Sequence, residues 1–363
     1  MKRLIKEEFI FLPKSKIKAG EGKTNGLYPF FTSSDIKKQY LDSFLFDDEL
    51  LFIGTGGSPS CNYYYGKASC STDNFVLKSK GRINTKYLYY LLRNDNFSLL
   101  SKGFHGAGLK HLGKDYLENV AFELKKPERQ QKIVEELDSI IKLIKEKESK
   151  ISSFDELVKS RFIEMFKTID LSEQKDDWVE IESKSRIITG TTPSTNDESN
   201  WGGNILWITP AEMTKETFYV YDTTRKLTEN GRKSKSLELM PEGTVLLSTR
   251  APIGKVGIVG KPMACNQGFK NFICDSSVNP IFLYVLLKNN TDYLNSLGSG
   301  TTFLEISKTK IGKMKIPVPE IKKQIEFAEF VKLIDKSKFI VRKEIELLQE
   351  LLESKMYEYF GNN

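Results

Sequence analysis

The sequence repeats itself at a spacing of 194 residues, and this feature constrains the fold more than any other. A single ungapped register, carrying matched hydrophobic positions, runs from Asp47 to Phe166 and onto the second half of the chain. We therefore predict two domains of one fold. The identities in this register pair Thr55 with Thr249, Gly66-Lys67 with Gly260-Lys261, Phe75 with Phe269, Tyr90 with Tyr284, Leu92 with Leu286, Asn96 with Asn290, Gly106 with Gly300, Lys114 with Lys308, Gln130 with Gln324, Glu135 with Glu329, Glu164 with Glu358 and Phe166 with Phe360.

The register changes upstream of Asp47. The segment YPFFTSSDI (28–36) resembles ILWITPAEM (205–213), which lies only 177 residues further on. The second half therefore contains an extra charged and polar segment near Thr214–Lys235. Two similar domains with different loops are typical of one task performed on two targets.

Each half ends in a predicted amphipathic helix of about 38 residues, which spans roughly 57 Å at ~1.5 Å per residue. Pro127-Glu128 suits the first turn of the first helix. The narrow apolar seams favour packing of the two helices on each other, and the alternative is that each helix packs on its own domain. The seams are Leu137, Ile140, Ile144, Lys147, Ile151, Phe154, Val158 and Phe162, and then Val331, Ile334, Lys338, Val341, Ile345, Leu348, Leu352 and Met356. We infer no pairing for the two seam lysines.

Short apolar runs precede each helix. Residues 50–57 and 244–254 are predicted to be buried strands, and residues 84–94 and 279–289 short helices opened by asparagine. The predicted order is an α/β domain over residues 1–127, a helix over 128–167, a second α/β domain over 168–319 and a helix over 320–363.

Composition excludes several classes of protein. The excess of 55 Lys and Arg over 48 Asp and Glu is mild, so the net charge of +7 fits either a polyanion partner or simple solubility. The four cysteines, in pairs nine residues apart, and the two histidines do not have the spacing of a zinc site, so we expect reduced cysteines and no metal. No apolar run reaches the ~20 residues of a membrane span, and no signal peptide is evident, so we expect a soluble cytoplasmic protein.

Catalytic motifs are also missing. The segment FIGTGG (52–57) contains the F-x-G-x-G pattern of a methyltransferase, but the chain has no Pro-Pro pair for a base-gripping loop. The matching segment LLSTRAP (246–252) lacks those glycines. A nuclease requires clustered carboxylates beside a lysine. Asp47-Asp48-Glu49 has no such lysine close behind it, and the triplet Glu320-Ile321-Lys322 lies at a predicted helix start, where capping of the helix dipole explains it. We expect no catalytic residues and no cofactor in this chain.

The duplicated motifs resemble those of the specificity subunits of Type I restriction-modification enzymes. In the second half they are residues 244–259, 264–272 and 299–324, and in the first half residues 54–75 and 106–134. The first half departs from the second in having Gly56-Gly57-Ser58 where the second has Arg250-Ala251-Pro252.

This resemblance implies an α+β protein with two tandem target-recognition domains, joined by two long antiparallel helices that form a coiled coil with pseudo-two-fold symmetry. Each domain is expected to read one half of a split DNA sequence, with the helices as a ruler between them. The expected partners are double-stranded DNA, two modification (methyltransferase) subunits that use S-adenosylmethionine, and restriction (motor-nuclease) subunits that use ATP and Mg²⁺.

The polar and basic loop residues are the candidates for DNA contact. Arg250 suits a guanine or a phosphate, Gln267 suits an adenine, and the turn at Gly190 suits phosphates through its backbone amides. For each residue the alternative is a structural turn. The candidates are Lys14, Lys16, Lys18, Thr55, Ser58, Lys67, Lys110 and His111 in the first half, and Gly190, Thr191, Thr192, Thr249, Arg250, Lys255, Asn266, Gln267, Lys270, Thr301 and Thr302 in the second.

Two other functions stay open at this point. A coiled-coil scaffold for protein partners would bind duplex DNA without a steep dependence on salt. A stand-alone modification enzyme would bind S-adenosylmethionine as the isolated chain.

Overall fold

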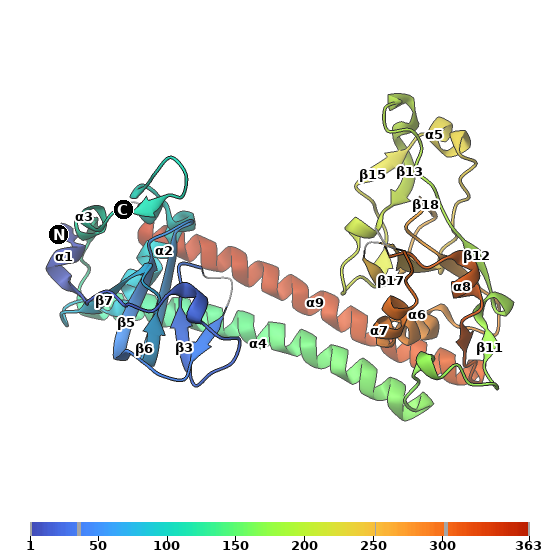
Figure 1. The fold of residues 1–363 in the computed structure, drawn as a ribbon, viewed down its shortest axis with the longest axis horizontal. Helices are drawn as coiled ribbons and strands as arrows, with labels where there is room; N and C mark the ends of the chain where they lie inside the picture. The colour runs from blue at the N-terminus through green and yellow to red at the C-terminus, as the bar shows by residue number, and fades with distance from the viewer. Residues whose placement is uncertain (1, 35–37, 251, 301–303, 362–363) are drawn as a thin grey trace. The chain divides into compact units, whose positions relative to one another are not determined.

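The computed structural model describes residues 2–34, 38–250, 252–300 and 304–361. The chain divides into two compact units, each drawing on both halves of the sequence. Unit 1 comprises residues 1–149 and 341–363, and unit 2 comprises residues 150–340. Each unit is described by itself (Figure 1).

Unit 1 is built on a six-stranded sheet with the order β2-β7-β5-β6-β3-β4. Side chains alternate along its central strand: Leu51 and Ile53 enter the core shared with helix α2 (Thr85–Ser101), and Leu50 and Phe52 enter a second core on the other face. The predicted buried strand at 50–57 is confirmed as the end of β5 and the turn that follows it. The strands are β2 (Phe9–Phe11), β3 (Tyr28–Phe31), β4 (Gln39–Leu41), β5 (Phe46–Gly54), β6 (Ser60–Cys70) and β7 (Asn74–Ser79).

Unit 2 has the same central strands, divided between two sheets of order β12-β19-β16-β17-β14 and β15-β13-β18. The central strand β16 is buried along its whole length, as predicted. The extra segment predicted near 214–235 supplies β14, β15 and the short helix α5. The strands are β12 (Ser185–Ile188), β13 (Trp201–Ile208), β14 (Tyr219–Val220), β15 (Arg225–Leu227), β16 (Val245–Thr249), β17 (Ile253–Val259), β18 (Met263–Cys265) and β19 (Asn271–Cys274).

The predicted short helices begin where the asparagines placed them. The side chains of Asn84 and Asn279 accept hydrogen bonds from backbone amides in the first turns of α2 and α6. The shorter helices are α1 (Ile5–Glu8), α2 (Thr85–Ser101), α3 (Lys114–Glu118), α5 (Glu229–Ser234), α6 (Pro280–Asn289), α7 (Thr291–Ser296) and α8 (Lys308–Gly312). Three strand pairs complete the fold: β1 (Lys2–Leu4) with β10 (Ala121–Glu123), β8 (Phe104–His105) with β9 (His111–Leu112), and β11 (Val179–Glu180) with β20 (Lys315–Ile316).

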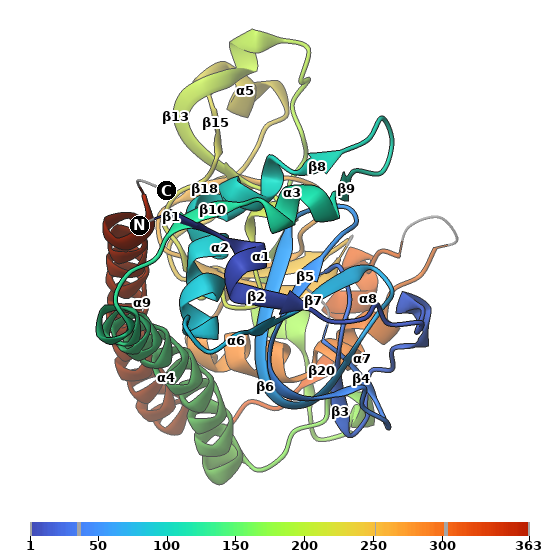
Figure 2. The ribbon, with the colours of Figure 1, turned by 90° about the vertical axis from the view of Figure 1, so that its left-hand side faces the viewer.

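The two long helices, α4 (Pro127–Phe166) and α9 (Ile321–Phe360), pair in antiparallel directions. In unit 1 the start of α4 lies beside the end of α9 (Figure 2), and Lys147 forms an ion pair with Glu344 at 2.5 Å. In unit 2 the order is reversed, and Lys338 pairs with Asp155 at 2.5 Å. The predicted coiled coil is therefore confirmed, and the seam lysines have acidic partners that the sequence analysis did not assign.

The alternative that each helix packs on its own domain also holds for its first turns. Ile133 and Leu137 of α4 belong to the core of unit 1, and Phe327 and Val331 of α9 belong to the core of unit 2. The remaining predicted seam residues are buried or half-buried along the helix pair: Ile140, Ile144, Ile151, Phe154, Val158, Ile334, Val341, Ile345, Leu348 and Leu352.

Each core is completed by the helix that belongs to the other half of the sequence. Phe360 at the end of α9 packs edge-on against Tyr87 in unit 1, with ring centroids 5.3 Å apart. Phe166 at the end of α4 packs edge-on against Phe282 in unit 2, at 5.0 Å. The internal repeat therefore forms two hydrophobic cores. The last turn of each long helix packs into the core of the domain from the other half of the sequence.

A buried glutamine ties each long helix to its domain. Gln130 Oε1 accepts from the Asn84 backbone amide at 2.9 Å, and its Nε2 donates to the Lys125 carbonyl at 2.8 Å. Gln324 forms the same two bonds in unit 2, accepting from Asn279 at 2.9 Å and donating to Pro319 at 2.6 Å. This pair of contacts explains why the glutamines match across the repeat.

The ungapped register is wrong by one residue in the middle of the domain. Ile53 pairs with Cys61, whereas its equivalent Leu247 pairs with Val256, so the second hairpin holds one more residue between these equivalent pairs. A β-bulge near Leu247 accommodates that residue. Equivalent residues are therefore 195 apart from β6 to α2, and the identities at Gly66-Lys67, Phe75, Tyr90, Leu92 and Asn96 do not mark equivalent positions.

Candidate nucleic-acid interface

The turn after the central strand gathers three loops in each domain. In the first domain the Thr55 amide donates to Asp73 O at 2.9 Å, and the Leu112 amide donates to Thr55 O at 2.9 Å. In the second domain the Thr249 amide donates to Gly268 O at 2.8 Å, and the Ile306 amide donates to Thr249 O at 3.0 Å. We call this place the loop edge; it comprises residues 55–60, 71–73 and 106–111 in the first domain and 249–250, 252–254, 266–268, 299–300 and 304–305 in the second.

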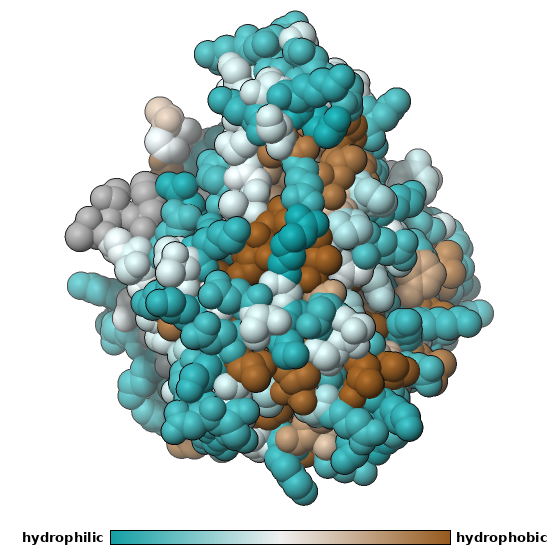
Figure 3. Space-filling view, turned by 90° about the vertical axis from the view of Figure 1, so that its right-hand side faces the viewer, coloured by the Kyte–Doolittle hydropathy of each residue, from teal (hydrophilic) through white to brown (hydrophobic). Residues whose placement is uncertain are grey.

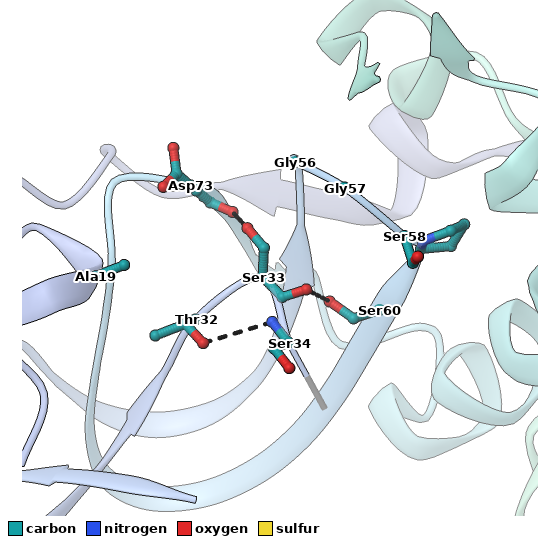
Figure 4. A pocket seen from close by; sticks show the side chains of 10 residues that line it. Ala19, Thr32, Ser33, Ser34, Gly56, Gly57, Ser58, Ser60 and Asp73 are labelled. Atoms are coloured by element: carbon teal, nitrogen blue, oxygen red, sulfur yellow. Dashed lines mark hydrogen bonds between the residues drawn. The ribbon is translucent and has the colours of Figure 1, made fainter. Parts of the chain in front are cut away.

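The loop edge of the first domain surrounds a hollow of small polar residues (Figure 4). Ser33 Oγ donates to Asp73 O at 2.9 Å, and Ser60 Oγ donates to Ser33 O at 3.1 Å, so the hydroxyls hold neighbouring loops together. Of the lining residues the sequence analysis chose only Ser58, which is exposed. The serines at 33 and 60 were missed, although 28–36 was recognised as part of the repeat. The lining consists of Ala19, Thr32, Ser33, Ser34, Gly56, Gly57, Ser58, Pro59, Ser60 and Asp73.

Several of the residues predicted to contact DNA lie close to this hollow. Lys110 and His111 are exposed, and the Gly57 amide donates to Lys110 O at 3.0 Å, which places both residues beside Ser58. Lys16 and Lys18 are exposed on either side of Ile17, whose carbonyl accepts from the Thr72 amide at 2.9 Å. Lys14 is also exposed, with its ammonium 5.0 Å from the centre of the Phe75 ring.

Two predicted residues of the first domain do not join this group. Thr55 is buried directly after the end of β5, so we assign it a structural role. Lys67 is exposed but pairs with Asp47 at the opposite end of the β5–β6 ladder from Gly54 and Ser60. Seven residues at ~3.3 Å each separate those ends by roughly 23 Å. Lys67 instead lies over the Phe44 ring, with 4.8 Å between its ammonium and the ring centre.

In the second domain the structure brings Thr192 and Gln267 together. Thr192 Oγ1 donates to Gln267 Oε1 at 2.8 Å, although the two residues are far apart in the sequence. Gln267 is exposed and Thr192 half-buried. The neighbouring Asn266 uses its side-chain oxygen to accept from the Gly268 amide at 2.9 Å, so Asn266 shapes the turn.

The basic residues of this loop edge share an acidic partner. Glu305 lies 3.3 Å from Lys270 Nζ and 3.9 Å from Arg250 Nε. Lys270 is buried, with 7% of its side chain exposed, so the prediction that it contacts DNA is not supported by its position. Arg250 is 40% exposed. The Lys255 ammonium donates to Pro210 O at 2.8 Å.

The remaining predicted residues of the second domain pack or hydrogen-bond within the fold, or lie outside the described residues. Thr249 is fully buried, as the equivalent Thr55 is buried. A Cβ on Gly190 would lie 1.8 Å from Cys265 O, so only glycine fits there. Thr191 O accepts from the Trp207 ring nitrogen at 3.3 Å. Thr301 and Thr302 are outside the described residues.

A second hollow lies beside this turn and carries cations that the sequence analysis missed. Arg186, Lys235 and Lys308 line it together with Gly190 and Thr191. Glu238 pairs with Arg186 at 2.7 Å, which leaves a positive excess of two charges among these side chains. Lys308 had appeared only as the repeat partner of Lys114. Figure 3 views unit 2 end-on, and hydrophilic residues cover most of its upper part, where β13, β15 and α5 lie.

Nothing among the described residues forms a metal site. No group of three or more His, Cys, Asp or Glu side chains in the described ranges has a suitable arrangement. Burial raises the pKa of the Cys265 thiol to about 12, which keeps it protonated at neutral pH. No helix in the described part of the chain has the length and apolarity to cross a membrane.

Two repeated α/β domains, each with a loop edge and each closed by an antiparallel helix pair, define a class of paired recognition proteins. The family model described as "Type I restriction modification DNA specificity domain" matches residues 8–153 and 175–351. The chain belongs to this family. The match falls on both halves of the sequence, in agreement with the internal repeat.

Individual relatives agree with this assignment. The chain is 35% identical over 200 residues to the Type I restriction enzyme MjaIX specificity subunit of Methanocaldococcus jannaschii, covering 54% of this chain but only 46% of that relative. It is 22% identical over 355 residues to the Escherichia coli EcoDI specificity subunit, covering 89% and 79%.

Solved structures show the same fold. A Type I restriction-modification S subunit from M. genitalium superposes with a TM-score of 0.63 at 16% identity, covering 98% of this chain and 94% of that one. A second structure, whose title concerns complex assembly and conformational transition of the Type I system, gives 0.56 at 16% identity, covering 99% and 97%.

Proposed function

We propose that this chain is the DNA-reading subunit of a Type I restriction-modification system. Each domain reads one half of a bipartite target through its loop edge, and the antiparallel helices set the separation of the halves. The chain acts in the cytoplasm, where it carries modification and restriction subunits to their DNA.

The observation that supports this proposal most strongly is that the two domains share their internal contacts but differ in their exposed loops. Gln130 and Gln324 form the same pair of hydrogen bonds, and Thr55 and Thr249 are held in the same way. The exposed residues of the two loop edges are different. Two DNA-binding domains of one fold that recognise two different sequences need shared internal contacts and different exposed residues.

The proposed DNA contacts combine exposed or partly exposed side chains with the half-buried turn at 190–192. Phosphate contacts come from cations that surround the loop edges, and base contacts come from polar side chains on them. For the first domain we propose Lys14, Lys16, Lys18, Ser58, Lys110 and His111, and for the second Gly190, Thr191, Thr192, Arg250, Lys255, Gln267, Lys235 and Lys308.

The helix pair is the proposed docking site for two modification subunits, with the restriction subunits joining them. S-adenosylmethionine, ATP and Mg²⁺ would be used by these partners. The residues of this chain bind and orient DNA and take no part in a chemical step.

Methylome sequencing of a host with and without this gene tests the proposal. A split adenine-methylation motif is expected to be present with the gene and missing without it. A methylome that does not change contradicts the proposal. Methylation or cleavage of DNA by the purified chain alone would contradict its non-catalytic part.

Binding to duplex DNA separates this function from that of a protein scaffold. If several phosphates are neutralised, the logarithm of the affinity falls steeply and linearly with the logarithm of the salt concentration. A scaffold without DNA specificity would show weak binding and a shallow slope.

A further inference from the structure

We infer that Gln267 reads an adenine in the half-site of the second domain, and that Thr192 is the positioning residue for its amide. This inference rests on the proposed function and adds to it one base and one pair of side chains. Neither the family match nor the relatives assign a role to these two positions.

The backbone on which Gln267 stands is held from three directions. The Asn266 amide donates to Ile208 O at 3.1 Å, and Gly268 O accepts from the Thr249 amide at 2.8 Å. The Asn266 side chain closes the turn through its bond to the Gly268 amide. The Gln267 side chain therefore projects to solvent from a fixed base between β18 and β19.

The loop that carries Thr192 is fixed as well. Gly190 packs against Cys265 O with no room for a side chain, and Thr191 O is bonded to the Trp207 ring nitrogen. Thr192 Oγ1 reaches Gln267 Oε1 from this loop and donates to it at 2.8 Å. Because the Thr192 hydroxyl donates to Oε1, it fixes the orientation of the Gln267 amide, with the oxygen on the side that faces Thr192.

An amide in this orientation matches one base in the major groove. Adenine offers a donor at N6 and an acceptor at N7, and a glutamine satisfies both with Oε1 and Nε2. Oε1 has a second lone pair, so it can accept from adenine N6 while it accepts from Thr192. Guanine presents two acceptors, O6 and N7, and one of them would face Oε1 without a proton between them. The positive side chain of Arg250, on the same loop edge, favours the approach of DNA.

The first domain has no equivalent of this pair. In the register that the hydrogen bonds establish, Thr72 occupies the place of Gln267, because Asp73 O and Gly268 O accept from equivalent threonine amides. The inference therefore concerns one half of the target, and the other half serves as an internal control.

The test selects bound sequences from a random duplex library, using the full chain assembled with its modification subunits. The unaltered complex is expected to enrich a bipartite motif. Gln267→Ala is expected to relax one A·T position in one half by about ten- to a hundredfold, and to leave the other half unchanged. Gln267→Glu is expected to move the preference at that position toward cytosine, whose N4 amino group is a donor.

Thr192→Val keeps the shape of the side chain and removes the hydroxyl. We expect it to weaken the same A·T preference about three- to tenfold, because the amide then loses its fixed orientation. Thr192→Ser restores the donor and is expected to restore the preference. In the Gln267→Ala background, Thr192→Val should add nothing at that position.

The outcomes are distinguishable. If the unaltered complex enriches no motif, the proposed function fails and the inference fails with it. If a motif appears and Gln267→Ala leaves it unchanged, or relaxes a G·C position, only the inference is overturned. If Gln267→Ala relaxes the A·T position but Thr192→Val and Thr192→Ser behave alike, the positioning role of Thr192 is overturned. Tryptophan fluorescence of each variant verifies that unit 2 is folded, since Trp178, Trp201 and Trp207 all lie there.

Discussion

The two loop edges differ far more than the domains that carry them. In the first domain, serines and glycines surround a hollow with Asp73 as its charged member. In the second, Arg250, Lys270 and Glu305 form a charged group beside Gln267. The hydrogen bonds beneath both edges are the same.

This difference separates two kinds of constraint on the sequence. Thr55 and Thr249 are both buried beneath the loop edge and bonded through their backbones in the same way, so the residue is repeated. The exposed side chains have no common requirement if their targets differ, so they diverge. The comparison also locates specificity, since a residue that is exposed and not repeated is the best candidate for reading a base.

The largest effect is expected from removing the contacts that the domains share. Gln324→Leu leaves the Asn279 amide and the Pro319 carbonyl without their buried partner, which should lower the free energy of unfolding by about 2–4 kcal/mol. The urea midpoint seen by tryptophan fluorescence, which reports on unit 2, is expected to fall. Gln130→Leu should leave that midpoint nearly unchanged and shift the part of the circular dichroism transition that belongs to unit 1.

The exposed Gln349 on α9 lies in unit 1 and provides the control for Gln130→Leu, because Gln349→Leu removes no buried contact. Equal fluorescence shifts from Gln324→Leu and Gln130→Leu would contradict the assignment of one glutamine to each unit.

The second prediction compares a charged side chain of the second loop edge with a small polar side chain of the first. Arg250→Ala is expected to weaken specific DNA binding by about 1–3 kcal/mol, because a guanidinium contact to a guanine or phosphate is lost. Ser58→Ala in the first domain should have a smaller effect, since no charge is removed. Fluorescence anisotropy with a cognate duplex measures both. A larger loss from Ser58→Ala would reverse the proposed contrast between the domains.

The third prediction concerns the cationic hollow of the second domain. The double change Lys235→Gln and Lys308→Gln is expected to reduce the slope of log affinity against log salt by about 2, uniformly across DNA sequences. The matched control is Lys67→Gln, because Lys67 lies at the far end of its strand ladder from the loop edge. A change in the preferred sequence, or an equal effect of the control, would count against a phosphate role.

Local patterns in the sequence were enough to predict most of the fold. Continuous apolar runs predicted β5 and β16, the asparagines predicted the starts of α2 and α6, and the seams predicted the helix pair. These features depend on residues close in sequence, or on a period. The one-residue shift between the domains was missed because a bulge leaves no clear mark, and accidental identities such as Gly66 with Gly260 fitted the simpler register.

The candidate site was harder to predict because it depends on burial and on distant partners. Thr55 and Thr249 are small polar residues in turns, and the sequence does not say whether such residues point inward. The contact between Thr192 and Gln267 joins loops from different parts of the domain. The ion pairs of the long helices could have been predicted from the sequence. In antiparallel helices, the numbers of paired residues have a nearly constant sum, as with 147 and 344 or 155 and 338.

The smallest effect is expected from those ion pairs. Lys338 is only 12% exposed, but its partner Asp155 is 43% exposed and is rehydrated easily when the lysine is removed. Lys338→Met is therefore expected to change the free energy of unfolding of unit 2 by less than about 1 kcal/mol, since the methionine packs into the seam while the charge pair is lost. Lys147→Met in unit 1 should behave alike, because Glu344 is also 43% exposed.

Charge reversal sharpens this last comparison. Lys338→Glu places a second carboxylate beside Asp155 and should lower the stability of unit 2 by about 1 kcal/mol, and adding Asp155→Lys should restore it, because the pair is then rebuilt in the opposite sense. Urea denaturation followed by tryptophan fluorescence at low and high salt measures both steps. If the double variant stays as unstable as Lys338→Glu alone, Asp155 is not the residue that Lys338 faces, and the antiparallel register assigned to unit 2 is wrong.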